Sequence, residues 1–500
     1  MSLYTINFIF FLACVGLVYY LAPQRWRWII LLASSLFFYA TYSAISAFAF
    51  GLVIVVNYVC ALSMSRVNVD KRKPLMVAGI AFNLAVLIFY KFLPTLFGGL
   101  LTRADSSLTA WLILPLGLSF QILQAIGYLV EVRKGAQPAE RHFGIFALYI
   151  LFFPRLLAGP VEKPQSLINQ FREEHPFNYK DVTDGMKVLA WGLFKKLVIA
   201  DRLAFVVASA YADPQSQDGV HLFFASLAFF VSIYADFSGY SDIAWGAARI
   251  FGIRITQNFN HPYASLSIAE FWQRWHISLS SWLREYLYFP LGGNRKGEAR
   301  TYINLILTMS LSSMWHEINP TFLVWGTLHG VYLAFFRFSD PFWERLRRAV
   351  RLDKFPRLTN FIRWGTTMFL LLFTYIIFRA DTLSDAWYIM THMFVGLRDY
   401  AFDSIRLLAQ TLPTFNGQVI LNALLEIASP LTLEKGAEAL VTCATLLAFL
   451  LLEWAQFDPA QLSSKPVYVR WTAYALIIAS LMFFTLAYDQ SQQQFFYFKF

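Results

Sequence analysis

The sequence predicts an all-α, polytopic membrane protein with about ten to twelve transmembrane helices and additional interfacial and re-entrant helices. Three observations support this prediction. Hydrophobic residues make up 57% of the 500 residues and charged residues only 14%, and the mean hydropathy is +0.49, whereas soluble domains are about 45–50% apolar and about 25% charged. Apolar runs of membrane-spanning length recur along the chain. The basic residues lie in short loops between these runs.

The formal net charge of +10 could indicate a nucleic-acid-binding protein. The basic residues, however, form neither a stripe nor a tail, and their placement in loops fits the positive-inside rule of membrane proteins. We therefore expect membrane lipid as the surroundings and no nucleic acid as a partner.

Five spans are predicted in the first 130 residues. They cover residues 4–22, 28–46, 47–65, 74–93 and 110–130. The first has no basic segment before its apolar run, so we interpret it as a retained span rather than a cleaved signal peptide. The loops that hold Arg25 and Arg66 fall on one side if the spans alternate, which places both in the cytoplasm. The connection after the fourth span, with Lys91 and Arg103, fits this scheme least well.

The next part of the chain contains a broken apolar run. In FGIFALYILFFPRLLAGPVEKP, which starts at Phe143, proline and glycine residues and Arg155 interrupt the helix. Membrane proteins tolerate such breaks only where the backbone is packed against protein or lines a cavity. A loop and two helices are predicted to follow, at residues 161–184, 185–210 and 220–236.

A Trp-rich amphipathic helix is predicted over residues 265–290. Its tryptophan and leucine residues recur at helical spacing, and Arg274, Arg284 and Glu285 lie mostly on the other side. A helix of this kind lies in the membrane interface rather than crossing the bilayer. His276 is on its apolar side.

Two short apolar helices are predicted at residues 302–316 and 321–337. Each has about 15–17 residues, which is short for a crossing of about 20, so we expect a thinned bilayer or a protein-lined funnel around them. His316 lies between them, in the sequence WHEINP. The basic segment that follows, at 337–363, is the strongest cytoplasmic anchor. The last elements are spans at 364–379, 437–455 and 471–488, with a loop or membrane-associated stretch at 400–436.

His316 is the first candidate catalytic residue. An ionisable group at membrane depth costs about 2.5–3.5 kcal/mol on insertion scales, so such groups commonly face a wet cavity and serve a function. A neutral imidazole can take a proton from a hydroxyl nucleophile, which makes His316 a candidate general base. The alternative is a histidine hydrogen-bonded between packed helices.

His276 is the second candidate. It is either a polar partner of His316 or a packing residue in the membrane interface. Two histidines in an apolar environment favour the first interpretation, because both rings need polar interactions. His329 is interpreted as a plain interhelical hydrogen bond.

Asp236 and Asp242 lie in the sequence DFSGYSD at the end of a predicted span. They could polarise a cavity, but we favour a structural role in which they pair with Arg249 or Arg254.

A metal site is not expected. His276, His316, His329 and Glu317 are potential ligands, but no HExxH motif occurs, and His316 and Glu317 are neighbours rather than one helical turn apart. The GxSxG elbow of serine hydrolases and a phosphate-binding glycine loop are also absent. We expect no permanently bound cofactor, and the sequence identifies no cofactor-binding residue.

Several long motifs, in order, resemble the membrane-bound O-acyltransferase (MBOAT) family. They are FSGYSDIAWGAARIFGI, NFNHPYASLSIAEFWQRWHISLSSWLREYLYFPLGGNR and MWHEINPTFLVWGTLHG, together with FPRLLAGPVEKP, FRADTLSDA and the terminal FFYFKF. Within the family, the chain resembles the bacterial alginate O-acetylation acyltransferases, with D-alanyl-teichoic acid transfer proteins nearby. The resemblance implies one membrane domain over residues 1–500, folded as a funnel, with the family's core motifs at about 110–340.

The resemblance also implies roles for residues and partners. His316 matches the essential histidine at the base of the funnel, and His276, in RWHISLS, matches the family's supporting histidine. The donor is expected to be acetyl-CoA or a related acyl thioester from the cytoplasm. The acceptor is expected outside the cytoplasm, on a periplasmic acetyltransferase partner protein that serves polysaccharide machinery. The protein is expected in the bacterial inner membrane as a multi-pass protein.

This sequence departs from the family pattern at two places. Glu317 stands where a glycine commonly follows the Trp-His pair, and a carboxylate there could orient His316 or alter its proton affinity. Gln121 and Gln124 stand in a stretch that is commonly richer in aromatic residues.

The leading hypothesis is transfer of an acyl group, an acetyl group in the first instance, for O-acetylation of a cell-surface or secreted polysaccharide such as alginate. Within the same class, D-alanyl transfer to teichoic acid and acyl transfer to peptidoglycan stay open. From another class, proton-coupled transport of a polymer or lipid would use the histidines as a relay. Transporters commonly have matching halves with discontinuous helices, and this sequence has one broken region without a second.

Overall fold

The computed structural model describes residues 2–41, 44–101, 115, 117–157, 159–431 and 437–487, and within these residues all regular structure is helical. The first half contains α1 (Ile6–Leu21), α2 (Arg27–Ala40), α3 (Ala44–Ser65), α4 (Val69–Leu101), α6 (Leu118–Lys134), α7 (Phe143–Leu151), α8 (Pro164–Leu167), α9 (Tyr179–Leu193), α10 (Asp201–Ala212) and α11 (Gly219–Ile250). The second half contains α12 (Ile268–Arg274), α13 (Ile277–Leu283), α14 (Glu298–His316), α15 (Pro320–Ala349), α16 (Pro356–Arg379), α17 (Leu383–His392), α18 (Leu397–Thr411), α19 (Gly417–Ala428), α20 (Ala437–Trp454) and α21 (Val467–Ala487). The start of the predicted span 110–130 and the terminal FFYFKF motif lie outside the described residues.

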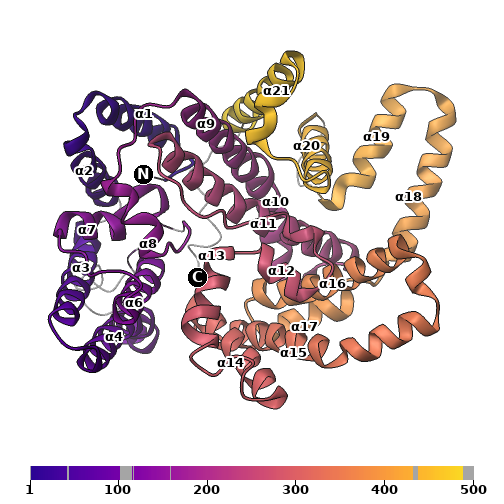
Figure 1. The fold of residues 1–500 in the computed structure, drawn as a ribbon. Helices are drawn as coiled ribbons and strands as arrows, with labels where there is room; N and C mark the ends of the chain where they lie inside the picture. The colour runs from indigo at the N-terminus through magenta and orange to yellow at the C-terminus, as the bar shows by residue number, and fades with distance from the viewer. Residues whose placement is uncertain are drawn as a thin grey trace.

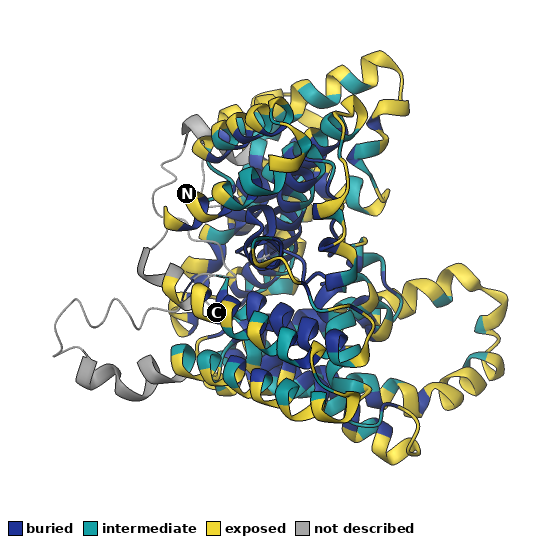
Figure 2. Cartoon of the chain, turned by 60° about the vertical axis from the view of Figure 1, so that its left-hand side comes forward, coloured by how far each residue is buried: buried dark blue, intermediate teal, exposed yellow. Residues whose placement is uncertain are grey.

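Helices from the first part of the chain lie on one side of the molecule, and helices from the later part lie on the other (Figure 1). A central group of helices joins the two sides. In Figure 1, α1 to α8 gather on the left, α9 to α13 occupy the middle, and α14 to α19 lie below and to the right. Buried residues concentrate in the interior, and the outward faces of the helices are exposed (Figure 2).

Several helices have the length and apolarity of membrane spans. Among the described residues, four meet both criteria: Val69–Lys91, Gly219–Ile250, Pro356–Arg379 and Val467–Phe484. Shorter apolar helices are Ile6–Leu21, Phe50–Ser65, Phe143–Arg155, Gly417–Ala428 and Val441–Trp454. Large apolar side chains on outward faces, such as Phe10 and Trp471, are exposed on the molecule itself, as expected for helices whose solvent is lipid. The predicted all-α membrane class is confirmed, and the count of ten to twelve spans stays a prediction.

The helix predicted at 185–210 is continuous but contains a π-helical segment. Phe194–Ala200 joins α9 to α10 in this way, and the combined helix packs along α11. The contact is close because it is built from glycine. A Cβ on Gly192 would lie 2.6 Å from the carbonyl oxygen of Gly239. Small residues at such crossings let two helix backbones approach each other in a membrane.

The two aspartates of DFSGYSD lie inside α11, so the predicted end of this span at 236 is wrong. They are paired with lysines of the π-helical segment: Lys195 lies 2.7 Å from Asp242 and Lys196 lies 2.7 Å from Asp236. A helix can continue through acidic residues in an apolar environment when opposite charges meet them. The predicted pairing of both aspartates with basic residues is confirmed by these ion pairs, but the predicted arginine partners are wrong. The structural role stays a prediction.

The apolar run that begins with α7 is broken, as predicted. Its Arg155 is only 2% exposed and donates hydrogen bonds to Gln124 and to the carbonyl of Tyr149. Gln121 and Gln124 donate in turn to the carbonyls of Leu156 and Tyr149, at 2.9 and 2.7 Å. The two glutamines that depart from the family pattern therefore satisfy the open backbone of the broken run.

The described part of 400–436 is not a loop. It contributes to two amphipathic helices, α18 and α19, which form a hairpin that stands at the edge of the molecule in Figure 1. The hydroxyl of Tyr400 donates to the carbonyl of Ile427 and ties the two helices together. The apolar residues of these helices cover only one face, so the stretch as a whole is too polar to stand out as a membrane span.

Candidate active site

The turn that carries His316 lies between two long helices. His316 is the last residue of α14, which has 19 residues, and α15 has 30 residues. The prediction of two short segments is therefore wrong, because α15 continues through Pro341 into the basic segment. Asn319 starts α15 by accepting a hydrogen bond from the Thr321 amide at 3.2 Å, and Pro320 occupies the first helical position, where it needs no donor.

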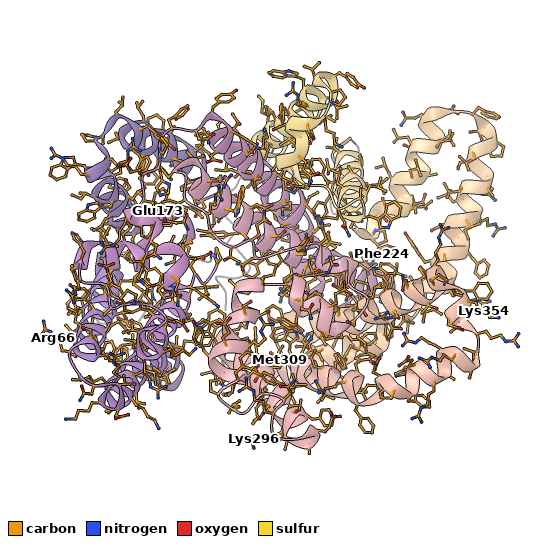
Figure 3. The ribbon with its side chains drawn as sticks, in the orientation of Figure 1. Arg66, Glu173, Phe224, Lys296, Met309 and Lys354 are labelled. Atoms are coloured by element: carbon orange, nitrogen blue, oxygen red, sulfur yellow. The ribbon has the colours of Figure 1, made fainter. Side chains whose placement is uncertain are left out.

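The imidazole of His316 is enclosed by aromatic rings. It is 7% exposed, and the ring of Trp325 lies 5.9 Å away, centroid to centroid. Phe322 and Phe378 each lie at 6.4 Å, the second from α16. Met309, labelled in Figure 3, lies on the buried face of α14 against α15. The packed hairpin and its aromatic wall thus hold His316 in a water-poor position.

His276 lies at a break that the amphipathic pattern did not show. The predicted single helix over 265–290 is wrong: α12 ends at Arg274, α13 starts at Ile277, and His276 has left-handed backbone angles (φ 43°, ψ 53°). Asn258 stabilises the break, because its carbonyl accepts from the Ile277 amide at 2.9 Å and its side chain accepts from the Ser278 amide at 3.1 Å. Hydrogen bonds from a distant loop therefore override local helical periodicity.

The ring of His276 is buried beside aromatic side chains. It is 1% exposed, and neither ring nitrogen has a partner among the residues that the structure describes. Phe237 contacts it edge-on at 4.7 Å. A buried histidine without any hydrogen bond is unusual for a purely structural residue.

The structure brings the two predicted histidines together. The ring of Phe120 connects the two histidines. Its centroid lies 6.2 Å from that of the His276 ring and 5.0 Å from that of Trp315, the residue before His316. The two imidazoles are close enough for their charges to interact. Residues separated by forty positions in the sequence thus lie near one another in the fold.

Lys91 belongs to this site and was missed. It lies inside α4 rather than in the loop to which the basic pattern assigned it. Its ammonium donates to the carbonyls of Trp315 and His316 and interacts electrostatically with Glu317. The available signal was a lysine within an apolar run, which in a membrane protein indicates a buried partner.

His329 makes the interhelical hydrogen bond that was predicted. The indole of Trp272, on α12, donates to its Nδ1 at 3.3 Å. His329 is fully buried on α15, so this bond connects the interfacial segment to the His316 hairpin.

Comparisons with known proteins show the family of this chain. Residues 107–380 match the MBOAT, membrane-bound O-acyltransferase family. The chain is 37% identical to the probable alginate O-acetylase AlgI of Azotobacter vinelandii over 401 residues, which is 77% of this chain and 76% of that protein. It is 35% identical to the peptidoglycan O-acetyltransferase of Helicobacter pylori over 407 residues, 75% of this chain and 74% of that protein.

A more distant similarity is to the teichoic acid D-alanyltransferase of Bacillus subtilis. It is 25% identical over 242 residues, which is 46% of this chain and 60% of that protein. The family match covers both histidines and more than half of the chain. This chain is therefore a multi-pass acyltransferase and belongs to the membrane-bound O-acyltransferase family.

Proposed function

We propose that this protein transfers an acetyl group from a cytoplasmic thioester, acetyl-CoA or a related acyl thioester, to an acceptor outside the cytoplasm. The product is an O-acetylated polysaccharide of the cell surface or the medium, such as alginate. The protein acts in the bacterial inner membrane. Relatives named as O-acetylases, with 35–37% identity over about three quarters of the chain, support the choice of acetyl as the acyl group.

The observation that carries the proposal is the enclosed pair of His316 and His276. His316 acts as the general base: its imidazole takes the proton of the acceptor hydroxyl while that oxygen attacks the thioester carbonyl. His276, whose two ring nitrogens have no partner among the residues that the structure describes, holds the attacking hydroxyl or accepts its proton in part. Positioned proton transfer of this kind contributes about 10²–10⁴-fold to a rate.

The acceptor is assigned as a hydroxyl on a periplasmic acetyltransferase partner protein, which passes the acetyl group to the polymer. The relative named as a peptidoglycan O-acetyltransferase gives a second candidate polymer, since its identity of 35% is close to the 37% of the alginate relatives. For either polymer this chain has the same role, which is to transfer acetyl groups across the membrane.

Acetyl transfer in membranes that contain the protein tests this proposal. Labelled acetyl-CoA is supplied on the cytoplasmic side, and label in alginate or peptidoglycan and release of free CoA thiol are measured. His316→Ala is expected to abolish transfer at equal protein level. His392→Ala is the matched control, because His392 is an exposed histidine on α17. Full activity of a well-inserted His316→Ala variant would refute the role of His316.

The polymer that gains label decides between the two acceptors. Label in alginate supports the leading proposal, and label in peptidoglycan alone supports the second. Proton flux without acetyl transfer in reconstituted vesicles would refute both.

A further inference from the structure

A row of buried polar side chains lies on α15 beside His316. Thr321, Trp325 and His329 follow one another at four-residue steps, so they share one face of the helix, and they are 1%, 5% and 0% exposed. At about 1.5 Å per residue, the row extends about 12 Å along the helix. It starts at the turn and runs toward the basic end of α15, which is the side from which the proposed donor arrives.

Two of these side chains carry ring N–H groups that can donate hydrogen bonds. The indole Nε1 of Trp325 and the Nε2 of His329 have no partner within the described part of the chain. Because Nδ1 of His329 accepts from Trp272 at 3.3 Å, the proton of its neutral ring is on Nε2. Nearly all buried polar groups in proteins are paired. Two N–H groups on one helix face that lack a partner among the described residues therefore indicate an acceptor that comes from a ligand.

The surroundings of these donors are apolar and adjoin His316. The Trp325 ring lies 5.9 Å from the His316 ring and 5.1 Å from that of His329, centroid to centroid. Phe378, on α16, lies 5.1 Å from Trp325 and closes the other side. A hydrogen bond made in such a low-dielectric place is stronger than the same bond in water.

The chemistry of the donors selects the ligand group. An indole N–H can only donate, so its partner is an acceptor such as a carbonyl oxygen. The acceptor substrate brings a hydroxyl, whose proton has to reach His316. The thioester brings a carbonyl oxygen, which accepts hydrogen bonds and gains negative charge during the reaction.

We propose that Trp325, with His329 beside it, binds the carbonyl oxygen of the thioester donor and stabilises the oxyanion that forms there. This assignment rests on the proposed function. In the first step, the hydroxyl oxygen bonds to the carbonyl carbon, its proton passes to His316, and the carbonyl π electrons move to the oxygen that faces the Trp325 N–H. In the second, the C=O bond reforms, the C–S bond breaks, and the leaving thiolate takes the proton from His316. The products are an ester and a free thiol.

Two analogues of acetyl-CoA test this assignment on the purified full chain in nanodiscs. One is a ketone, in which a methylene replaces the thioester sulfur and the carbonyl is kept. The other is the S-ethyl thioether, which has no carbonyl in place of the acetyl carbonyl. The unmodified protein is expected to bind the ketone roughly tenfold more tightly, as one hydrogen bond in an apolar site allows.

Trp325→Phe removes the N–H and keeps an aromatic ring. We expect it to lose the preference for the ketone, to keep its affinity for the thioether, and to lower kcat for acetyl-CoA roughly 10²–10³-fold, as the loss of one oxyanion donor does. Phe322→Leu is the matched control, because it also changes a ring against His316 but removes no donor. It is expected to preserve the ratio of the two affinities.

The outcomes separate this assignment from the proposed function. If Trp325→Phe keeps the ketone preference, the assignment is overturned while the acetyl-CoA donor stands. If the unmodified protein binds neither analogue, the proposed donor fails and the assignment fails with it. If the variant does not fold, the carbonyl stretching frequency of the ketone bound to the unmodified protein decides. A shift to lower frequency than in hydrocarbon solvent supports an N–H donor, and an unshifted band overturns it.

Discussion

The ammonium group of Lys91 donates a hydrogen bond to the main-chain carbonyl of His316, 225 residues further along the chain. It also donates to the carbonyl of Trp315. The last carbonyls of a helix have no partner within that helix, and a cation near them interacts favourably with the helix dipole. Lys91 therefore completes the end of α14 from a helix outside the hairpin, and the position of His316 depends on α4.

Lys91→Met should lower acetyl transfer about tenfold or more. Hydrogen bonds from a charged group contribute about 1.5–3 kcal/mol, and each 1.36 kcal/mol lost from transition-state stabilisation is about a tenfold loss in rate. Methionine keeps the length of the side chain and removes both bonds. The measurement is kcat for acetyl transfer in membranes that contain equal amounts of protein.

Lys71→Met is the control for this variant. Lys71 is exposed near the start of the same helix, so the same chemical change there should leave the rate unchanged. Equal rates for the two variants would show that the contact of Lys91 with the turn is dispensable.

Glu317 should act through Lys91 rather than directly on His316. Its carboxylate is half-buried and interacts with the Lys91 ammonium, so Glu317→Gln leaves Lys91 with less compensation for its charge. We expect the double variant Lys91→Met, Glu317→Gln to lose little more activity than Lys91→Met alone. Coupled neighbours typically differ from additivity by about 0.5–3 kcal/mol. Rates that multiply independently in the four proteins of this cycle would contradict the coupling.

The parts of this site that the sequence predicted are those that local patterns encode. The apolar run that ends at His316 and the Asn319-Pro320 start of the next helix are local signals, and the structure has both. The break at His276 was not predictable from periodicity, because Asn258 in a preceding loop makes the hydrogen bonds that stabilise it. Lys91 was missed for a related reason. The pattern of charges in loops predicts on which side of the membrane a basic residue lies, but it does not predict which residues its side chain contacts.

The ion pairs of α11 also separate what local sequence patterns predict from what depends on the packing of distant helices. The sequence predicted that Asp236 pairs with a basic residue, but it did not identify Lys196 as that residue. Its partner Lys196 lies on a π-helical segment, whose altered period turns side chains away from the positions that a regular helix would give them. A pairing across helices depends on that geometry.

His276→Asn should separate catalysis from folding. Asparagine tolerates the left-handed conformation that His276 adopts (φ 43°), as few other residues do. The variant is therefore expected to keep the thermal midpoint of unfolding and to lose acetyl transfer about 10²-fold or more, within the range of a positioned proton-transfer group.

His261→Asn is the matched comparison for that variant. His261 also has left-handed backbone angles (φ 45°), but its Nδ1 is bonded to Glu453 at 3.0 Å and so joins the core to α20. We expect this substitution to lower the stability by about 0.5–1.5 kcal/mol, the usual contribution of one hydrogen bond, with little change in kcat. If His276→Asn lowers the midpoint and leaves kcat unchanged, His276 is structural.

Gly326→Ala should move His316 by separating the two helices that position it. A Cβ on Gly326, in α15, would lie 2.3 Å from the Ser313 hydroxyl and 2.6 Å from the carbonyl oxygen of Met309, both on α14. A backbone carbonyl cannot turn away, so the helices must part, and overpacking of this kind costs about 1–3 kcal/mol.

Gly365→Ala is the control, since nothing lies within 4 Å of the position that its Cβ would take, and alanine there should stabilise α16 by up to about 1 kcal/mol. Thermal unfolding and kcat are measured on both variants in the same detergent. Because the turn with His316 follows directly from α14, Gly326→Ala should lower kcat as well as stability, and a variant that loses stability but keeps kcat would show that the site tolerates the displacement.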